Sequence, residues 1–183
     1  MATKPVKGVK GERGVRRTAP EQKQQAASQG ERMLRILPLS SLHERDAMER
    51  VRLVKQGVPA QLLVVLARDM AISREKLYAT IGVPRATADR KIREQALLNP
   101  DESERALGIA RLVGQVDQIV RESGSPEGTE GTEGFDAARW AAAWLDRPHP
   151  ALGGVRPATL MDTAEGRGIV SDLVAQMQSG AYV

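Results

Sequence analysis

A proline-rich stretch near the carboxyl end carries the side chains best suited to docking on another molecule. Pro148 and Pro150 fix their own φ angles and push the residues before them toward extended conformations. The Gly153-Gly154 pair can then turn the chain sharply without steric cost. The stiff loop would present three basic side chains to a partner, namely Arg147, His149 and Arg156. A purely structural corner between two helices would explain the same residues equally well.

A second basic group lies on the helix predicted from about residue 84 to residue 97. When each residue adds about 100° around the axis, Ala88 and Ile92 mark the buried side and Arg90 falls directly opposite. The outward face and its edges carry these polar residues: Arg85, Thr87, Arg90, Lys91 and Arg93. A short helix from Ser73 to Ile81 and a turn at Gly82 come before it, as in a helix-turn-helix whose second helix reads the major groove. The alternative is an ordinary bundle helix whose charged face meets solvent.

No arrangement of residues in the sequence indicates catalysis. The chain has no glycine-rich phosphate loop, no His-Glu-x-x-His pair and no nucleophile with a paired base. Its two histidines, His43 and His149, are far apart in the sequence, and it has no cysteine, so the ligands of a metal site do not gather. We expect a protein that is not an enzyme and that uses no metal and no cofactor.

Helices must position the basic groups, because the composition disfavours a sheet. Apolar residues make up 41% of the chain and aromatic residues only 3%, so the core must be aliphatic. Caps and helical spacing predict an all-α fold. Besides the helices above, we expect helices from Ser40-Ser41, with Glu44 closing a capping box, to Gly57; from Pro59 to Met70; from Asn99-Pro100 to about Val120; from Asp136 to about Asp146; from Pro157 over a short stretch; and from Thr163 to Gly180.

Apolar stripes on these helices should face the core. The stripes are Ala47, Met48, Val51 and Val54 in the first helix; Leu107, Ala110, Val113, Val116, Ile119 and Val120 in the long helix after Asn99; and Ile169, Val170, Leu173, Val174 and Met177 in the last helix. Trp140 and Trp144 lie four residues apart, share one helix face and are expected in the core. The long helix would pack within its own chain or pair with its twin in a dimer.

Charge divides the chain into a basic front and an acidic back. Residues 1–30 carry a net charge of +5, residues 31–123 carry +3 and residues 124–183 carry −4. We expect a disordered basic arm over 1–38, a helix-turn-helix domain over 39–122, a flexible acidic glycine-rich linker over 123–134 and a small helical domain over 135–183. The arm would add sequence-independent phosphate contacts or merely increase solubility. Without a signal peptide or an apolar membrane span, a cytoplasmic protein is expected.

The motifs together resemble a known family over roughly residues 40–183. The back half resembles the toxin-binding domain of the Xre/MbcA/ParS antitoxins in Trp144-Leu145, Pro148, Ala151-Leu152-Gly153-Gly154, Pro157, Leu160-Met161-Asp162-Thr163, Gly166 and Gly180-Ala181-Tyr182. The front half resembles the Xre-type helix-turn-helix of the same antitoxins in Ser73-Arg74-Glu75-Lys76-Leu77, Ile81-Gly82-Val83, Thr87, Arg90-Lys91 and the helix start at residues 101–105. Tyr78 departs from the pattern, since compact motifs often have a small residue there. The Gly-Glu-Thr repeat is a second departure, because it enlarges a connection expected to be shorter in relatives.

The resemblance implies an antitoxin with two partners. The first is a RES-domain toxin that consumes NAD or transfers its ADP-ribose group, and the antitoxin would block its active-site cleft. Candidate toxin contacts are Arg147, His149, Arg156 and Tyr182. The second partner is operator DNA, bound by the predicted helix-turn-helix in a homodimer that represses its own operon and also forms a hetero-oligomer with the toxin. The alternative is a stand-alone helix-turn-helix transcription regulator whose carboxyl-terminal domain binds a ligand or another partner.

Overall fold

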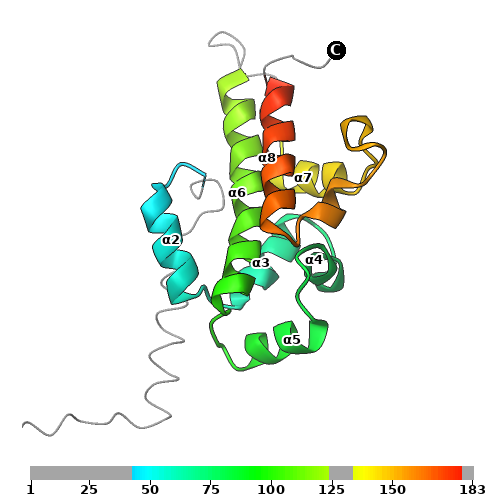
Figure 1. Ribbon diagram of the computed structural model, residues 1–183. Coiled ribbons are helices and arrows are strands. Elements are labelled where there is room, and N and C mark those ends of the chain that lie inside the picture. The colour runs from blue at the N-terminus through cyan, green and yellow to red at the C-terminus, as the bar shows by residue number, and fades with distance from the viewer. Residues whose placement is uncertain (1–42, 124–133, 179–183) are drawn as a thin grey trace, which may run out of the picture.

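The computed structural model describes residues 43–123 and 134–178, and these residues form helices without any strand (Figure 1). The α-helices are α2 (Ala47–Gln56), α3 (Gln61–Asp69), α4 (Arg74–Thr80), α5 (Arg85–Arg93), α6 (Pro100–Ser123), α7 (Ala137–Leu145) and α8 (Ala164–Gln178), and the 3-10 helices are η3 (Pro150–Leu152) and η4 (Pro157–Leu160). The all-α prediction is confirmed. Among the described residues, no helix has both the length and the apolar character needed to span a bilayer.

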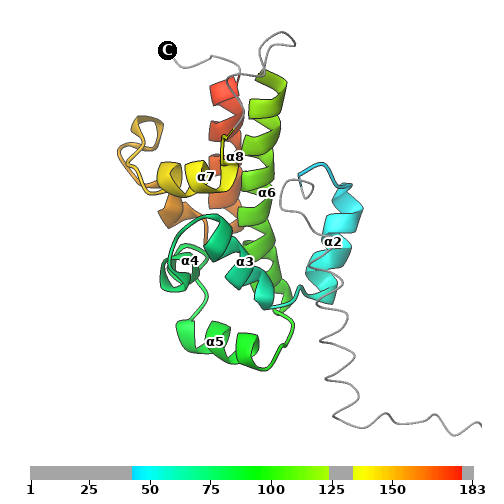
Figure 2. The ribbon, with the colours of Figure 1, turned by 180° about the vertical axis from the view of Figure 1, so that it is seen from behind.

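Helix α6 is the centre of the fold. It contacts α2, α3, α7 and α8, and Figure 2 shows α8 running beside it for most of its length. Its start was predicted correctly: the Asn99 Oδ1 atom accepts a hydrogen bond from the Glu102 N–H at 2.8 Å, and Glu102 Oε2 accepts one from the Asn99 N–H at 2.8 Å. This reciprocal cap satisfies two backbone N–H groups that a helix start leaves without partners. Buried residues then occur all around the helix rather than on one stripe, because it packs on several neighbours.

Helices α4 and α5 form the predicted helix-turn-helix geometry. Ser73 Oγ accepts a hydrogen bond from the Lys76 N–H at 3.1 Å and so caps α4, as predicted. Gly82 turns the chain with a φ of +63°, and a β-carbon there would lie 3.0 Å from Asp162 Cβ. The Arg105 guanidinium donates to the Gly82 carbonyl at 2.9 Å, which fixes this turn against α6. The turn is therefore held both by α6 and by the segment that precedes α8.

Helix α5 ends at Arg93, so the predicted end near Leu97 is wrong. Gln95 adopts a φ of 51°, the left-handed conformation that ends a helix. The next residues pair with the α2–α3 connection instead, because the Leu98 N–H donates to the Val58 carbonyl at 2.8 Å and the Ala60 N–H donates to the Ala96 carbonyl at 3.0 Å. These contacts between distant segments replace the hydrogen bonds that another helical turn would have made.

The apolar stripes of α2 and α8 differ from the prediction. Helix α2 begins at Ala47 and is capped by Asp46, so Glu44 lies in the turn before it, while Ser40 and Ser41 lie outside the described residues. Met48 is 60% exposed and Val51 is 42% exposed, whereas Leu53 is the buried residue of this helix. In α8, Ile169 is exposed, whereas its neighbour Val170 is fully buried. Helix α2 therefore turns a different side to the core than hydrophobicity alone indicates, whereas the predicted stripe of α8 is confirmed except at Ile169.

One hydrophobic core extends from α2 to α8. Buried side chains of the predicted helix-turn-helix region and of the predicted carboxyl-terminal domain belong to the same cluster, with both tryptophans half-buried against it. An ion pair of 3.0 Å between Lys76 of α4 and Asp146 at the end of α7 also joins the two parts. The predicted linker lies almost wholly outside the described residues, as does the predicted basic arm. The predicted domain boundaries stay a prediction.

Tyr78 shows how this helix-turn-helix accommodates a large residue. The side chain is buried, with 2% of the residue exposed, and its hydroxyl donates a hydrogen bond to Asp89 Oδ1 at 3.1 Å. This bond connects α4 to α5. Burial first, and then the hydrogen bond to Asp89, raise the pKa of Tyr78 to about 12 from its usual value of 10. The tyrosine side chain therefore links the two helices and does not lie on the surface.

We expect Tyr78→Phe to lower the free energy of unfolding by about 1 kcal/mol at neutral pH, because one buried hydrogen bond is lost. The folded state keeps the tyrosine proton up to a pKa of about 12, whereas the unfolded chain releases it near 10. The stabilisation by Tyr78 is thus complete below pH 10 and is lost as the pH rises through 12. Urea unfolding of both proteins should show a difference that shrinks between pH 10 and 12; a constant difference would contradict the hydrogen bond.

Candidate functional site

The proline-rich stretch forms a loop that closes on itself between α7 and η4. The His149 N–H donates to the Val155 carbonyl at 3.0 Å, and the Gly154 N–H donates to the His149 carbonyl at 3.0 Å. Gly153 and Gly154 have φ angles of +64° and +85°, which glycine alone adopts at little cost. Figure 1 shows this loop protruding from the body of the protein beyond α7. The predicted stiffness therefore comes from the prolines and from these cross-loop hydrogen bonds together.

The loop is a surface feature. Its exposed residues are Arg147, Pro148, Pro150, Ala151, Gly153, Gly154, Val155 and Arg156. A β-carbon placed on Gly153 or Gly154 would meet no atom within 4 Å. This exposure leaves both alternatives from the sequence open, a docking loop and a structural corner between two helices. The loop does connect two helices, but its tip points into solvent and can meet another molecule.

The structure brings three of the predicted partner-binding residues together in this loop. Arg147 is exposed, and Arg156 lies 3.9 Å from Asp146 in an exposed ion pair. Such a pair contributes little to stability, so Arg156 can leave it for a partner at small cost. A hydrogen bond from Lys76 and the positive charges of Lys76 and Arg156 lower the pKa of Asp146. Tyr182, the fourth predicted contact, lies outside the described residues.

A row of aromatic rings supports the base of the loop. Trp140 and Trp144 stack with ring centroids 5.9 Å apart and an angle of 12° between the rings. Phe135 extends the row at one end, 6.4 Å from Trp140, and His149 extends it at the other end, 5.6 Å from Trp144. The spacing of the two tryptophans predicted their shared face, but nothing in the sequence placed His149 against them. His149, one of the predicted contact residues, therefore also anchors the base of the loop.

The outward face of α5 carries three exposed arginines. Arg90 lies 3.2 Å from Glu94, and Arg85 lies 3.3 Å from Glu75 and 3.4 Å from Asp89. Arg93 has no ion-pair partner among the residues that the structure describes. Thr87 is half-buried on the same helix. Exposed ion pairs are weak, so these guanidinium groups are available to phosphates or base edges.

Lys91 has a different environment from the other predicted DNA contacts. Its ammonium forms an ion pair with Glu102, and the two side chains are only 14% and 10% exposed. Glu102 also belongs to the reciprocal cap of α6, so this pair ties α5 to the start of the central helix. The structure therefore separates Lys91 from the outward face on which Arg85, Arg90 and Arg93 lie.

Comparisons with known proteins agree in both halves of the chain. Residues 49–111 match the antitoxin Xre-like helix-turn-helix domain, and residues 131–180 match the antitoxin Xre/MbcA/ParS C-terminal toxin-binding domain. A relative from Sphingobium sp. (strain YBL2), the Prs ADP-ribosylating antitoxin, is 38% identical over 142 residues, which cover 78% of this chain and 86% of the relative. The antitoxin Xre of Yersinia enterocolitica is 25% identical over 129 residues, which cover 70% of this chain and 78% of that protein. These families and relatives are antitoxins, not enzymes.

The ion pair of Lys91 predicts a difference between two neighbouring cations. Lys91→Ala should lower the free energy of unfolding by about 1–3 kcal/mol, because Glu102 is left buried without its partner. Arg93→Ala is the matched control, and it should change stability by less than about 0.5 kcal/mol because its side chain is exposed. Urea denaturation measures both. Equal changes in the free energy of unfolding for the two substitutions would show that the ion pair of Lys91 does not stabilise the start of α6.

Proposed function

Since this chain belongs to the Xre/MbcA/ParS family of antitoxins, we propose that its toxin is a RES-domain enzyme that consumes NAD or transfers ADP-ribose. The loop from Arg147 to Arg156 enters the active-site cleft of that toxin, and α5 binds operator DNA. The observation that carries the proposal is the protruding, internally hydrogen-bonded loop inside the segment that matches the toxin-binding domain. The name of the Sphingobium relative, which contains the term ADP-ribosylating, supports this class of toxin.

The loop is well suited to exclude a dinucleotide. Its backbone is already restrained by two prolines and by its cross-loop hydrogen bonds, so little conformational entropy is lost on binding. Arg147 and Arg156 extend from its two ends and can form forked hydrogen bonds with carboxylates of the cleft or stack on its aromatic rings. A plug of this kind prevents NAD from entering. The tail around Tyr182 would add a second contact.

The second part of the proposal is autorepression. In a homodimer, the α5 helix of each copy would enter one major groove, with half-sites about one helical turn or a multiple apart. Arg90 and Arg93 would contact base edges or phosphates, and Arg85 would position the helix on the backbone. Because α5 and the loop are on different parts of the fold, one chain could hold the toxin and DNA at the same time (Figure 1).

We expect the double variant Arg147→Ala/Arg156→Ala to bind the toxin at least tenfold more weakly, because arginines dominate the binding energy of many interfaces. The product of the neighbouring gene is tested as the toxin, and its NAD consumption and its effect on growth provide the readouts. Arg139→Ala is the matched control, since Arg139 is an exposed arginine of α7 outside the loop. It should neutralise like the wild type.

Removal of residues 148–183 should abolish neutralisation altogether. If the truncated chain still protects cells, or if Arg139→Ala and the loop variant lose binding equally, the loop does not occupy the cleft. Co-purification distinguishes the antitoxin from the remaining alternative, a stand-alone transcription regulator. Such a regulator would bind DNA but would not retain the neighbouring gene's product.

Arg90→Ala should weaken binding to the cognate operator by about 1–3 kcal/mol, as expected for an arginine that contacts a base. Electrophoretic mobility shifts with operator and unrelated DNA measure this loss. Arg68→Ala, an exposed arginine of α3, is the control and should bind as the wild type does. An unchanged shift for Arg90→Ala would place another element in the groove.

A further inference from the structure

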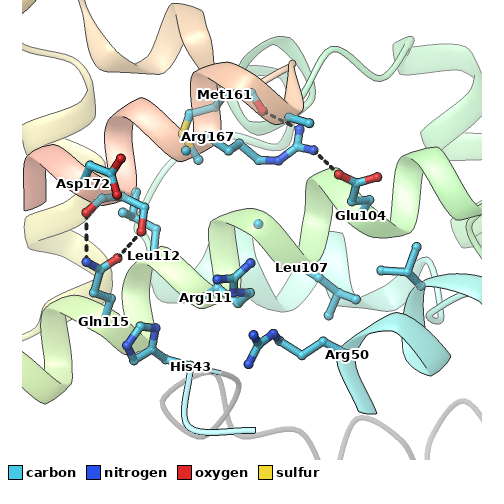
Figure 3. Close-up of a pocket in the computed structure, with 15 residues that line it drawn as sticks. His43, Arg50, Glu104, Leu107, Arg111, Leu112, Gln115, Met161, Arg167 and Asp172 are labelled. Atoms are coloured by element: carbon cyan, nitrogen blue, oxygen red, sulfur yellow. Dashed lines mark hydrogen bonds and ion pairs between the residues drawn. The ribbon is translucent and has the colours of Figure 1, made fainter. Parts of the chain in front are cut away.

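A cleft of about 360 Å³ lies between α2, α6 and α8, away from the loop and from α5. Figure 3 shows the basic side chains that converge on it: Arg50 from α2, Arg111 from α6, Arg167 from α8, and His43 from the turn before α2. No pattern in the sequence predicted this group, because its members are scattered over more than 120 residues. None of them belongs to the predicted DNA-binding or toxin-binding sets.

Two helical glycines line the cleft. Gly108 lies where Arg167 crosses α6, and a β-carbon at position 108 would collide with the Arg167 side chain. Gly168 on α8 also lines the cleft, and a β-carbon there would meet no atom within 4 Å. The missing β-carbon of Gly108 therefore lets Arg167 of α8 lie against α6 beside the cleft.

The positive charges of the cleft are not all compensated from within the chain. Arg167 is paired with Glu104 at 2.6 Å and also donates to the Met161 carbonyl at 3.2 Å. Arg50 donates a hydrogen bond to the Arg45 carbonyl, which carries no full charge. Arg111 has neither a hydrogen bond nor an ion pair from its guanidinium to any described residue. The arginine at the centre of the cleft thus lacks a carboxylate of its own.

The positions and the pKa shifts of the basic side chains agree with this lack of compensating negative charge. Figure 3 shows the Arg50 and Arg111 guanidinium groups next to one another, with Asp172 on the opposite wall of the cleft, on α8. Burial, followed by the charges of Arg50 and Arg167, lowers the pKa of Arg111. Burial and the charges of Arg111 and Arg50 likewise lower the pKa of His43. Each cation therefore raises the energy of the next, and an anion between them would relieve the repulsion.

We propose that this cleft binds a phosphate group of a small ligand, held between the guanidinium groups of Arg50 and Arg111. Two planar guanidinium forks supply the several donors that the oxygens of one phosphate accept. Three helices wall the site, so a small phosphorylated molecule fits it better than a duplex backbone does. Arg167, whose side chain is only 12% exposed, is already neutralised by Glu104 and forms part of the wall.

Calorimetric titration of the full chain in phosphate-free buffer tests the proposal with inorganic phosphate, pyrophosphate and AMP. We expect saturable binding of at least one of them, and at least tenfold weaker binding by Arg111→Gln. Binding of AMP at least tenfold tighter than that of inorganic phosphate would identify a nucleotide as the source of the phosphate; comparable binding would identify the free anion. Arg121→Gln is the matched control, because Arg121 is another α6 arginine that pairs with Glu44 and Asp117 outside the cleft.

Thermal unfolding without ligand gives an independent readout. Arg111→Gln should leave Tm unchanged or raise it, because the substitution removes a charge that its neighbours repel. Phosphate should raise the Tm of the wild type but not that of Arg111→Gln. The proposal is overturned if none of the three anions binds at millimolar concentration, or if Arg121→Gln loses as much affinity as Arg111→Gln. It is also overturned if duplex DNA binds at the site and none of the small anions does.

Discussion

The fold depends on the burial of α6 on most of its surface. A helix of 24 residues with a single apolar stripe would lie on the outside of a bundle, whereas α6 has Ala106, Ile109 and Ala110 fully buried and packs on four neighbouring helices. The helix-turn-helix and the helices that carry the protruding loop are therefore built on the same support. The ion pair between Lys76 and Asp146 and the contact of Gly82 with Asp162 add links between them. The two surfaces thus have a fixed geometry relative to each other.

The environment decides what each cation of this basic protein can do. Arg90 and Lys91 are adjacent in the sequence, yet Arg90 meets solvent and Lys91 is enclosed beside Glu102. A solvated arginine keeps its charge available for a polyanion, while the buried lysine uses its charge to satisfy a carboxylate that would otherwise be costly to bury. Arg111 represents a third case, an exposed arginine that lines the cleft close to other cations and has no carboxylate partner among the described residues. Of these three environments, a helical projection of the sequence predicts only that of Arg90, which is exposed on the outward face of α5.

Local signals predicted the helices well, and contacts between distant segments account for the errors. Ser73, Asn99 and Asp136 cap helices because their side chains reach N–H groups only a few residues away, which a sequence pattern can specify. The end of α5 depends instead on a pairing between residues 58–60 and 96–98, and the exposure of Met48 depends on which side of α2 meets α6. Neither is encoded in local spacing. The same reason explains why the loop could be located from its prolines and glycines, whereas the basic cleft required the packing of three helices.

The protruding loop and the basic cleft are surfaces of opposite shape, since the loop projects from the body of the protein and the cleft is a hollow in it. In the loop, prolines and cross-loop hydrogen bonds hold a short backbone segment outside the core, where Arg147 and Arg156 are exposed. In the cleft, basic side chains from three helices face a hollow, and the described residues compensate their charges only in part. A protruding, preordered segment suits insertion into a larger concave partner, whereas a walled hollow suits a ligand smaller than the protein. Because both features are built on α6 and the elements packed against it, neither requires a separate domain to position it.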